Sequence, residues 1–310
     1  MKASSPWVSE VPPTSAFASA LLPGAQHVVS YHLVRSGACW AGLVGGPPLQ
    51  LDAGDILVIP HGDSYFMSSA PDLRSSGAPL DVIVGFFREM TMASAPRVVI
   101  EGGGGPERLD VVCGFLGCDV RPFNPVLASL PRLIHLRRES TMTGPDRLTR
   151  LIEFALAESG EGTAGAKCVL LHLSEILFVE VVRRYLETLT AGHTGWLAGL
   201  RDPLVGHVLA RLHDRPTDSW TLDRLAREVG TSRSALADRF THLVGLPPMR
   251  YLTQWRLQLA AQMLANGAVK VSAVAQDVGY ESEAAFSRAF KKFVGVSPAV
   301  WRRRTIDDNR

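Results

Sequence analysis

The sequence is poor in cysteine and has no long apolar run. Its four cysteines are scattered unevenly over 310 residues, which argues against a disulfide framework and suits a reducing compartment. No stretch approaches the ~20 consecutive apolar residues that a membrane-spanning helix requires. The N-terminal MKASSPWVSEVPP also lacks the apolar segment of a signal peptide. These absences predict a cytoplasmic protein without a membrane span.

Two common enzyme signatures are missing as well. The chain has no Gly-x-Ser-x-Gly elbow for a serine nucleophile. The glycines at 102–105 lie between two predicted strands, without the helix and the Lys-Ser/Thr pair of a phosphate-binding loop. With 46% hydrophobic and 20% charged residues, the composition is that of an ordinary globular protein, long enough for two domains.

Charge is divided unevenly along the chain. Residues 200–310 contain 17 Lys/Arg against 11 Asp/Glu, and residues 1–199 contain the remaining 15 against 19. The C-terminal third therefore carries a net charge of +6 and the rest of the chain −4. A basic region of this kind is suited to nucleic-acid phosphates.

The basic region contains an internal repeat. LDRLAREVG at 222–230 returns as VSAVAQDVG at 271–279. Each copy is followed by a polar segment and then by a predicted helix with apolar residues at i, i+4 and i+7. A Gly, a Pro and an aromatic residue end each unit. We predict two helix-turn-helix units, at about 222–244 and 271–294.

Glycine and serine mark the turn in each unit. Gly230 and Gly279 stand where a first helix must end, because glycine enters the left-handed conformation at little cost. Ser232 and Ser282 are suited to cap the second helices.

One stripe of each second helix is predicted to be buried. It consists of Leu236, Phe240 and Leu243 in the first copy and Phe286, Phe290 and Phe293 in the second. The opposite face is then free to enter a DNA major groove. On that face we place Ser234, Asp238 and Arg239 in the first copy and Glu283, Ser287, Arg288 and Lys291 in the second.

A helix is predicted between the two units, over 249–266. It would be roughly 27 Å long at ~1.5 Å per residue. One turn of B-DNA separates successive groove faces by about 34 Å. A rigid spacer of this length would hold both second helices in adjacent major-groove segments on one side of the duplex.

Residues 203–304 resemble the DNA-binding domain of the AraC/XylS family of bacterial transcription regulators. The most specific part is VGYESEAAFSRAFKKFVGVSPAVWRRR, which matches the family's pattern of glycine, aromatic residue, serine, Phe-x-x-x-Phe, glycine and Ser-Pro. The resemblance implies base contacts near the starts of the second helices. The matching positions are Ser234, Ala237 and Asp238 in the first copy and Glu283, Ala284, Ser287 and Arg288 in the second.

The basic candidates have distinct expected roles. Arg288 is predicted to grip guanine O6 and N7, worth roughly 1–3 kcal/mol of discrimination. Its alternatives are a phosphate contact or a salt bridge to Glu281 or Glu283. Phosphate contacts are expected from Lys291 and Lys292, alongside Arg302 to Arg304. Arg233 and Arg239 complete the set of candidate DNA contacts.

The other candidates offer less typical chemistry. Ala237 and Ala284 provide only a methyl group, for a thymine methyl for instance. Asp238 and Glu283 can accept from a cytosine amino group, or else cap and pair within the protein.

The region after Gly24 is patterned as short strands. VVSYHLVRSG, ACWAGLVGG, DILVIPHGD and YFMSS alternate apolar and polar residues between Gly and Pro, and PLDVIVGFF, RVVIEGG and RLDVVCGFLGC are predicted to continue the sheet. Several short strands separated by turns favour a small β-barrel or sandwich.

Two stretches of this region resemble a cupin-like sensor domain found in one branch of AraC-type regulators. LDAGDILVIPHGDSYF is similar to the turn and strand of cupin barrels, and CGFLGCDVRPFNPVLASLP strengthens the likeness. We therefore predict an α+β chain. A cupin-like β-barrel with a helical hairpin occupies 1–190, a linker 191–202, and an all-α double helix-turn-helix domain 203–304.

Helical periodicity predicts the hairpin at 146–158 and 166–189. The second helix is apolar over so much of its circumference that one neighbour would hardly cover it. By resemblance it is the contact of a homodimer. From its broad apolar surface we expect Leu177 to face outward. The alternative is that the helix covers the open side of the barrel.

A cupin enzyme is the rival interpretation. Such enzymes hold a metal with a His-x-His, a Glu and a later His. Here His27 and His32 lie on opposite faces of a strand, and Tyr65 stands where the later His is expected. We therefore predict a regulator and not an enzyme.

The N-terminal cysteines are the candidate sensing residues. Cys113 and Cys118 could pair as a redox-active disulfide or share a metal ion, completed by His32 or His61. Inert core thiols are the alternative. We predict a sequence-specific DNA-binding regulator, with RNA polymerase as a further partner if it activates genes.

Overall fold

The computed structural model describes residues 1–75, 79–92, 100–118, 122–138, 146–160, 164–190, 193–266 and 269–308. The chain divides into two units. Unit 1 comprises residues 1–119 and 130–188, and unit 2 comprises residues 120–129 and 189–310. Within the described ranges, no helix is both long and apolar enough to cross a membrane.

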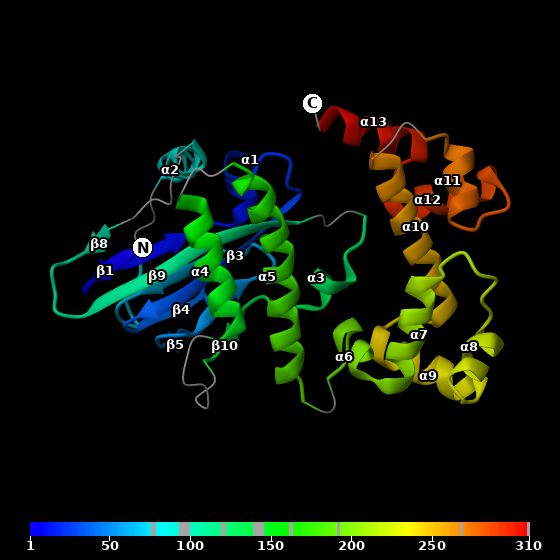
Figure 1. The fold of residues 1–310 in the computed structure, drawn as a ribbon, viewed down its shortest axis with the longest axis horizontal. Helices are drawn as coiled ribbons and strands as arrows, with labels where there is room; N and C mark the ends of the chain where they lie inside the picture. The colour runs from blue at the N-terminus through cyan, green and yellow to red at the C-terminus, as the bar shows by residue number, and fades with distance from the viewer. Residues whose placement is uncertain are drawn as a thin grey trace. The chain divides into compact units, whose positions relative to one another are not determined.

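Unit 1 is built on two sheets (Figure 1). The larger has the order β10-β6-β3-β9-β1-β8 and the smaller the order β2-β7-β4-β5. The strands are β1 Lys2–Ser4, β2 Val8–Val11, β3 His27–Ser36, β4 Cys39–Leu43, β5 Leu49–Leu51, β6 Ile56–Ile59, β7 Tyr65–Ser68, β8 Ile100–Gly102, β9 Arg108–Cys118 and β10 Ile134–Leu136. Neighbouring strands are antiparallel, except for β1 with β8.

The α+β class is confirmed, but the described strands form two separate sheets and not a closed barrel. Three of the four edge strands in the described sheets, β5, β8 and β10, have three residues each, so they offer few hydrogen bonds to a further neighbour. An alternating pattern predicts that a strand has a buried face, but it does not predict which edges will pair.

Two apolar clusters cover one face of the larger sheet, and the first of them joins it to the smaller sheet. The first gathers Val34 of β3, Val111 of β9 and Tyr65 of β7 among its members. The second closes the other end of the same sheet face, where the rings of Phe17 and Phe87 stack with centroids 4.2 Å apart. Phe17 follows the 3-10 turn Thr14–Ala16 and precedes α1 (Ala18–Leu21), and Phe87 lies on α2 (Leu80–Met92).

Residues 80–92 correct one sequence prediction. The PLDVIVGFF stretch was predicted to continue the sheet, yet it forms the helix α2. Its apolar residues Leu80, Ile83, Val84 and Phe87 follow helical spacing, and Phe87 is the one that is buried. A short apolar run is compatible with both the strand and the helix period, and packing against the rest of the protein decides which of the two forms.

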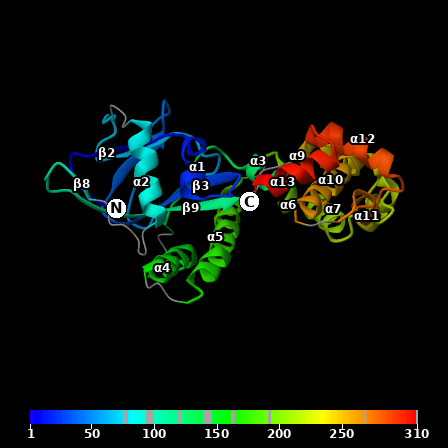
Figure 2. The same cartoon turned by 90° about the horizontal axis from the view of Figure 1, so that it is seen from above.

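The hairpin consists of α4 (Arg147–Gly160) and α5 (Ala166–Thr188), which pack on each other. In Figure 2 it lies on one side of the larger sheet, while α2 lies on the other. Leu173, Leu177 and Val181 form the buried stripe of α5. Leu177 is 3% exposed, so the prediction that it faces outward is wrong.

Unit 2 is helical. Its helices are α3 Pro125–Ser129, α6 Trp196–Arg201, α7 Pro203–Asp214, α8 Leu222–Glu228, α9 Arg233–Val244, α10 Pro248–Asn266, α11 Val271–Asp277, α12 Glu283–Val294 and α13 Pro298–Asp308. The predicted linker thus includes α6, which contacts α7 and α9. Phe123, which precedes α3, packs edge-to-face on Phe293 and donates its N–H to Gln258 Oε1 at 2.9 Å.

Two apolar cores divide unit 2 along α10. Leu209, Leu236 and Phe240 belong to the first core, and Phe286 and Phe290 belong to the second. The first turns of α10 contribute to one core and its last turns to the other. The spacer helix is therefore the common wall of the two repeats.

Candidate nucleic-acid interface

Each helix-turn-helix unit is held by the same local interactions. The Ser232 hydroxyl accepts from the Ala235 N–H at 3.2 Å, and the Ser282 hydroxyl accepts from the Ala285 N–H at 3.4 Å. These hydroxyls cap α9 and α12 by satisfying amides that have no partner inside the helix. The preceding turns pass through Gly230 and Gly279, both with positive φ. A residue with a side chain would be strained there.

Both second helices bury the stripe that the sequence indicates. Leu236, Phe240, Phe286 and Phe290 have no exposed surface, while Leu243 and Phe293 are half-buried. At about 100° per residue, the face opposite that stripe is occupied by four positions in each helix. These are Ser234, Asp238, Thr241 and His242 on α9, and Ala284, Arg288, Lys291 and Lys292 on α12.

The outward face of α12 is cationic. Arg288, Lys291 and Lys292 are exposed, and none of them forms an ion pair within the described part of the chain. The alternative salt bridge from Arg288 to Glu281 or Glu283 is thus not formed. Glu283 is exposed in the first turn of α12, where a carboxylate is favoured by the helix dipole.

The outward face of α9 carries no basic residue apart from His242. Ser234 and Asp238 are exposed, Ala237 is half-buried on the flank of the helix, and Ser287 occupies the corresponding flank of α12. Arg233 is exposed at the helix start, with its guanidinium 3.6 Å from the Asp223 carboxylate.

Arg239 departs from its predicted role. Its Nε and Nη2 lie 2.9 and 2.5 Å from Asp202 Oδ2, and the ion pair raises the pKa of the guanidinium. Asp202 also caps α7 by accepting from the amides of Leu204 and Val205. Arg239 therefore joins α9 to the start of α7 and does not belong to the outward face.

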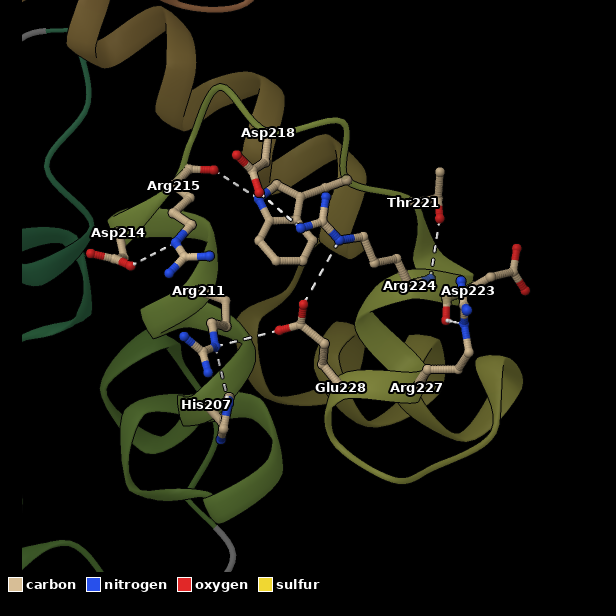
Figure 3. A network of polar contacts seen from close by, with 11 residues as sticks. His207, Arg211, Asp214, Arg215, Asp218, Thr221, Asp223, Arg224, Arg227 and Glu228 are labelled. Atoms are coloured by element: carbon tan, nitrogen blue, oxygen red, sulfur yellow. Dashed lines mark hydrogen bonds and ion pairs between the residues drawn. The ribbon is translucent and has the colours of Figure 1, made fainter.

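A polar network that the sequence reasoning missed fixes α8 against α7 (Figure 3). Glu228 on α8 pairs with Arg211 of α7 at 3.4 Å and with Arg224 at 3.8 Å. Arg224 also pairs with Asp218 at 2.8 Å and lies 4.1 Å over the ring of Trp220. The ion pairs described in unit 2 all join residues within 202–239. The basic residues of the first repeat are thus largely engaged within the protein.

Comparison with known proteins gives two family matches. A family described as Cupin matches residues 1–187, and one described as Helix-turn-helix domain matches residues 225–304. A putative AraC-like transcription regulator of Streptomyces lividans is 34% identical over 284 residues, which cover 90% of this chain and 88% of that protein. The chain belongs to the AraC-like transcription regulators.

Other relatives agree with the family. The transcriptional regulator AlkR of Acinetobacter baylyi is 31% identical over 282 residues, which cover 91% of this chain and 90% of AlkR. Among solved structures, the C-terminal domain of AraT from Geobacillus stearothermophilus is 29% identical and covers 33% of this chain and 86% of that one, with a TM-score of 0.33. The resemblance inferred from the sequence is confirmed, and unit 2 of this AraC-like regulator is a double-stranded-DNA-binding domain.

The thiols of the regulator's cupin unit are not brought together, contrary to prediction. Cys113 and Cys118 lie five residues apart on the single strand β9, so they point to opposite sheet faces, and neither is in a disulfide. Cys113 packs against the core between the sheets, and burial raises the pKa of its thiol to about 11. A protonated thiol is a poor nucleophile and metal ligand.

His32 is also committed to the core. It lies opposite Cys113 in the β3–β9 ladder, and its Nε2 is 2.8 Å from the Tyr65 hydroxyl. Burial lowers the pKa of the imidazole to about 3, so it is neutral. In the described part of the chain, no three His, Cys, Asp or Glu side chains gather as metal ligands. Cys168 and His172 are exposed on α5 and lie outside the core.

Proposed function

We propose that α12 supplies the main DNA contacts of this regulator. The cationic outward face of α12, opposite two fully buried phenylalanines, carries this proposal. Arg288 near the helix start reads a guanine, because its guanidinium can donate to O6 and N7 together. Lys291 and Lys292 lie one turn further on and contact phosphates.

The test begins with selection of bound fragments from genomic DNA by the purified full-length protein. The whole chain is used because Phe123, which belongs to unit 2 but precedes the rest of that unit by more than 60 residues in sequence, packs on Phe293 of α12. We expect a shared sequence motif, bound with an affinity that falls steeply as salt rises. Recovery of unrelated fragments with equal affinity would contradict a sequence-specific regulator.

The cupin unit acts in this proposal as a sensor and not as an enzyme. Its support is the side-chain chemistry of the interior, where Tyr65 fills the place of a metal-binding histidine and His32 is hydrogen-bonded to it. The rival is a metal-dependent cupin enzyme with a helical appendage. Elemental analysis of the purified regulator separates the two, because stoichiometric iron, manganese or zinc would favour the enzyme.

The regulator further forms a homodimer through the outward side of the hairpin. Val169, Ile176 and Val179 of α5 are 37, 46 and 48% exposed, and Phe154 of α4 is 52% exposed. Apolar side chains repeated at helical spacing and open to water favour burial against a second copy. A two-fold pair of subunits would match repeated half-sites in DNA.

Ile176→Glu tests the dimer. We expect the variant to sediment as a monomer at micromolar concentration while it stays folded. Leu171→Glu is the matched control, because Leu171 is 60% exposed but lies about 140° away around the helix at ~100° per residue. A native mass for Ile176→Glu, or an equal loss in both variants, would refute this interface.

A further inference from the structure

The two sheets of unit 1 leave a cavity where they fail to join. The edge of the smaller sheet is β5, and one edge of the larger sheet is β10. A cavity of about 750 Å³ is lined from both sides, by Trp40, Gln50, Asp52, His135, Arg137 and Arg138 among others. Small-molecule sites in proteins have volumes of about 300–1,000 Å³. We call this cavity the seam site.

Two arginines give the seam site an excess of hydrogen-bond donors. Arg137 and Arg138 follow β10 and are exposed, and neither guanidinium forms an ion pair with any residue that the structure describes. A guanidinium presents its N–H groups in a fork that matches the two oxygens of a carboxylate. Both arginines line the seam site, so its lining carries two guanidinium groups that can bind an anion.

The nearest buried carboxylate is already saturated. Asp55 accepts from the Arg138 backbone N–H at 2.9 Å, the Asp52 N–H at 3.1 Å and His135 Nε2 at 2.8 Å. Burial acts to raise the pKa of Asp55, but these hydrogen bonds hold it below the usual value. Asp55 is thus ionised, and its hydrogen bonds hold the Asp52–Asp55 turn to β10 and the residues after it. It forms no ion pair with Arg137 or Arg138, so both guanidinium groups can bind a ligand. Asp52 is the one other carboxylate among the lining residues.

Part of the lining of the seam site is apolar. Trp40 is half-buried on β4, paired in register with Gln50 of β5, and Pro48 and Leu49 line the cavity beside it. An indole ring provides a broad apolar surface that a flat ligand can cover. We propose that the seam site binds a small organic carboxylate, held by Arg137 and Arg138 with its apolar part against Trp40.

The seam site is linked by hydrogen bonds to the helical hairpin. Arg184 of α5 donates to the backbone oxygen of Arg137 at 2.7 Å and pairs with Asp146 at 2.5 Å. Asp146 in turn accepts from the Thr149 N–H and caps α4. The side chains of Arg184 and Asp146 are only 12 and 10% exposed, so their ion pair is largely shielded from solvent. A ligand that moves Arg137 therefore also displaces Arg184 of α5 and Asp146 at the start of α4.

This regulatory consequence rests on the proposed function, in which the cupin unit senses and the hairpin dimerises. Binding of a carboxylate at the seam site does not rest on it. The binding experiment can therefore fail while the regulator still binds DNA, and DNA binding can fail while the carboxylate still binds.

The experiment titrates the full-length protein with benzoate, octanoate and succinate, and with benzamide as the uncharged analogue of benzoate. Calorimetry measures binding, and the part of the tryptophan fluorescence change that is lost in Trp40→Phe reports on Trp40, one of six tryptophans in the chain. We expect saturable binding of benzoate or octanoate and none of benzamide. The double variant Arg137→Gln/Arg138→Gln should bind at least tenfold more weakly. Arg108→Gln, at the exposed start of β9, is the control for loss of an arginine outside the seam site and should bind as the parent does.

Two further measurements keep the proposal falsifiable. Arg137→Lys/Arg138→Lys retains the charge but cannot form the forked contact, so it should also weaken carboxylate binding. It replaces the double Gln variant as the test if that variant fails to fold. DNA affinity of each variant without ligand reports whether unit 2 is intact. Absence of saturable binding for all three carboxylates, or parental affinity in the Lys variant, would overturn the seam site.

Discussion

The two helix-turn-helix units have the same framework and opposite outward faces. Each has a serine cap, a positive-φ glycine at the turn and a fully buried stripe on its second helix. The outward positions differ completely: Ser234, Asp238, Thr241 and His242 on α9 correspond to Ala284, Arg288, Lys291 and Lys292 on α12. One face carries a negative charge and the other carries three positive charges, with histidine neutral.

This difference separates affinity from discrimination. Phosphate attraction supplies most of the sequence-independent affinity for DNA, and of the two outward faces that of α12 presents the positive charge for it. Asp238 of α9 is repelled by phosphates and can only accept hydrogen bonds, so it favours a base with an exposed amino group. We therefore expect the second unit to anchor the regulator and the first unit to select among sites.

The largest effect on stability and DNA affinity is expected from removing a buried phenylalanine ring from the core of either helix-turn-helix unit. Phe290→Ala should lower the free energy of unfolding by about 3–5 kcal/mol, and Phe240→Ala by a similar amount, because both rings are fully buried. Urea unfolding measures the loss. If α12 is the anchor, DNA affinity falls much further in Phe290→Ala than in Phe240→Ala. Equal losses of affinity would erase the distinction between the two units.

Within α12, two substitutions separate base reading from phosphate binding. Arg288→Ala should relax preference at one base position by roughly 1–3 kcal/mol, because the forked contact to guanine is lost. Lys292→Ala should weaken all sequences alike and flatten the salt slope by about one unit. Competition binding with single-base operator variants measures both. A uniform loss in Arg288→Ala would place that residue with the phosphate contacts.

Reversing the charge on α9 makes the first unit resemble the second. Asp238→Arg should tighten binding to unrelated DNA and steepen the salt slope by about one unit, because one more phosphate contact forms. Preference at the base read by Asp238 should weaken. Asp238→Asn is the control, since it removes the charge and adds no cation. A salt slope unchanged in Asp238→Arg would show that α9 lies away from the phosphates.

The smallest effect is expected from Arg239. Because its guanidinium is paired with Asp202, Arg239→Ala should leave base preference unchanged in the same competition assay. The variant to compare with it is Arg288→Ala, which removes the corresponding charge but should change the base preference at one position of the operator. A changed base preference in Arg239→Ala would return this arginine to the reading face.

The repeat could be predicted from sequence because its signals are local. Caps, turn glycines and apolar stripes lie within one helix-turn-helix unit, and Phe286 and Phe290 fix a buried face by spacing alone. The role of Arg239 could not be predicted in this way. Its partner Asp202 is 37 residues away in sequence, and neither residue type reveals the pairing.

Unit 1 shows a different limit. The β3 and β9 stretches were predicted as strands, but the separation of Cys113 and Cys118 follows only once β9 is known to continue without a turn through Gly114 and Gly117. A bend at either glycine would have brought the thiols closer. The straight strand is fixed by its long ladder with β3, an interaction with residues 27–36.

The division of each reading helix into an inward and an outward stripe also bears on how such a regulator acquires new targets. None of the four outward positions of each helix belongs to a cap or to the buried stripe, so these positions can vary with little effect on folding. Substitutions there change which DNA is bound without first destabilising the protein. One helix-turn-helix unit can therefore acquire preference for another operator sequence while the other unit maintains the affinity for DNA.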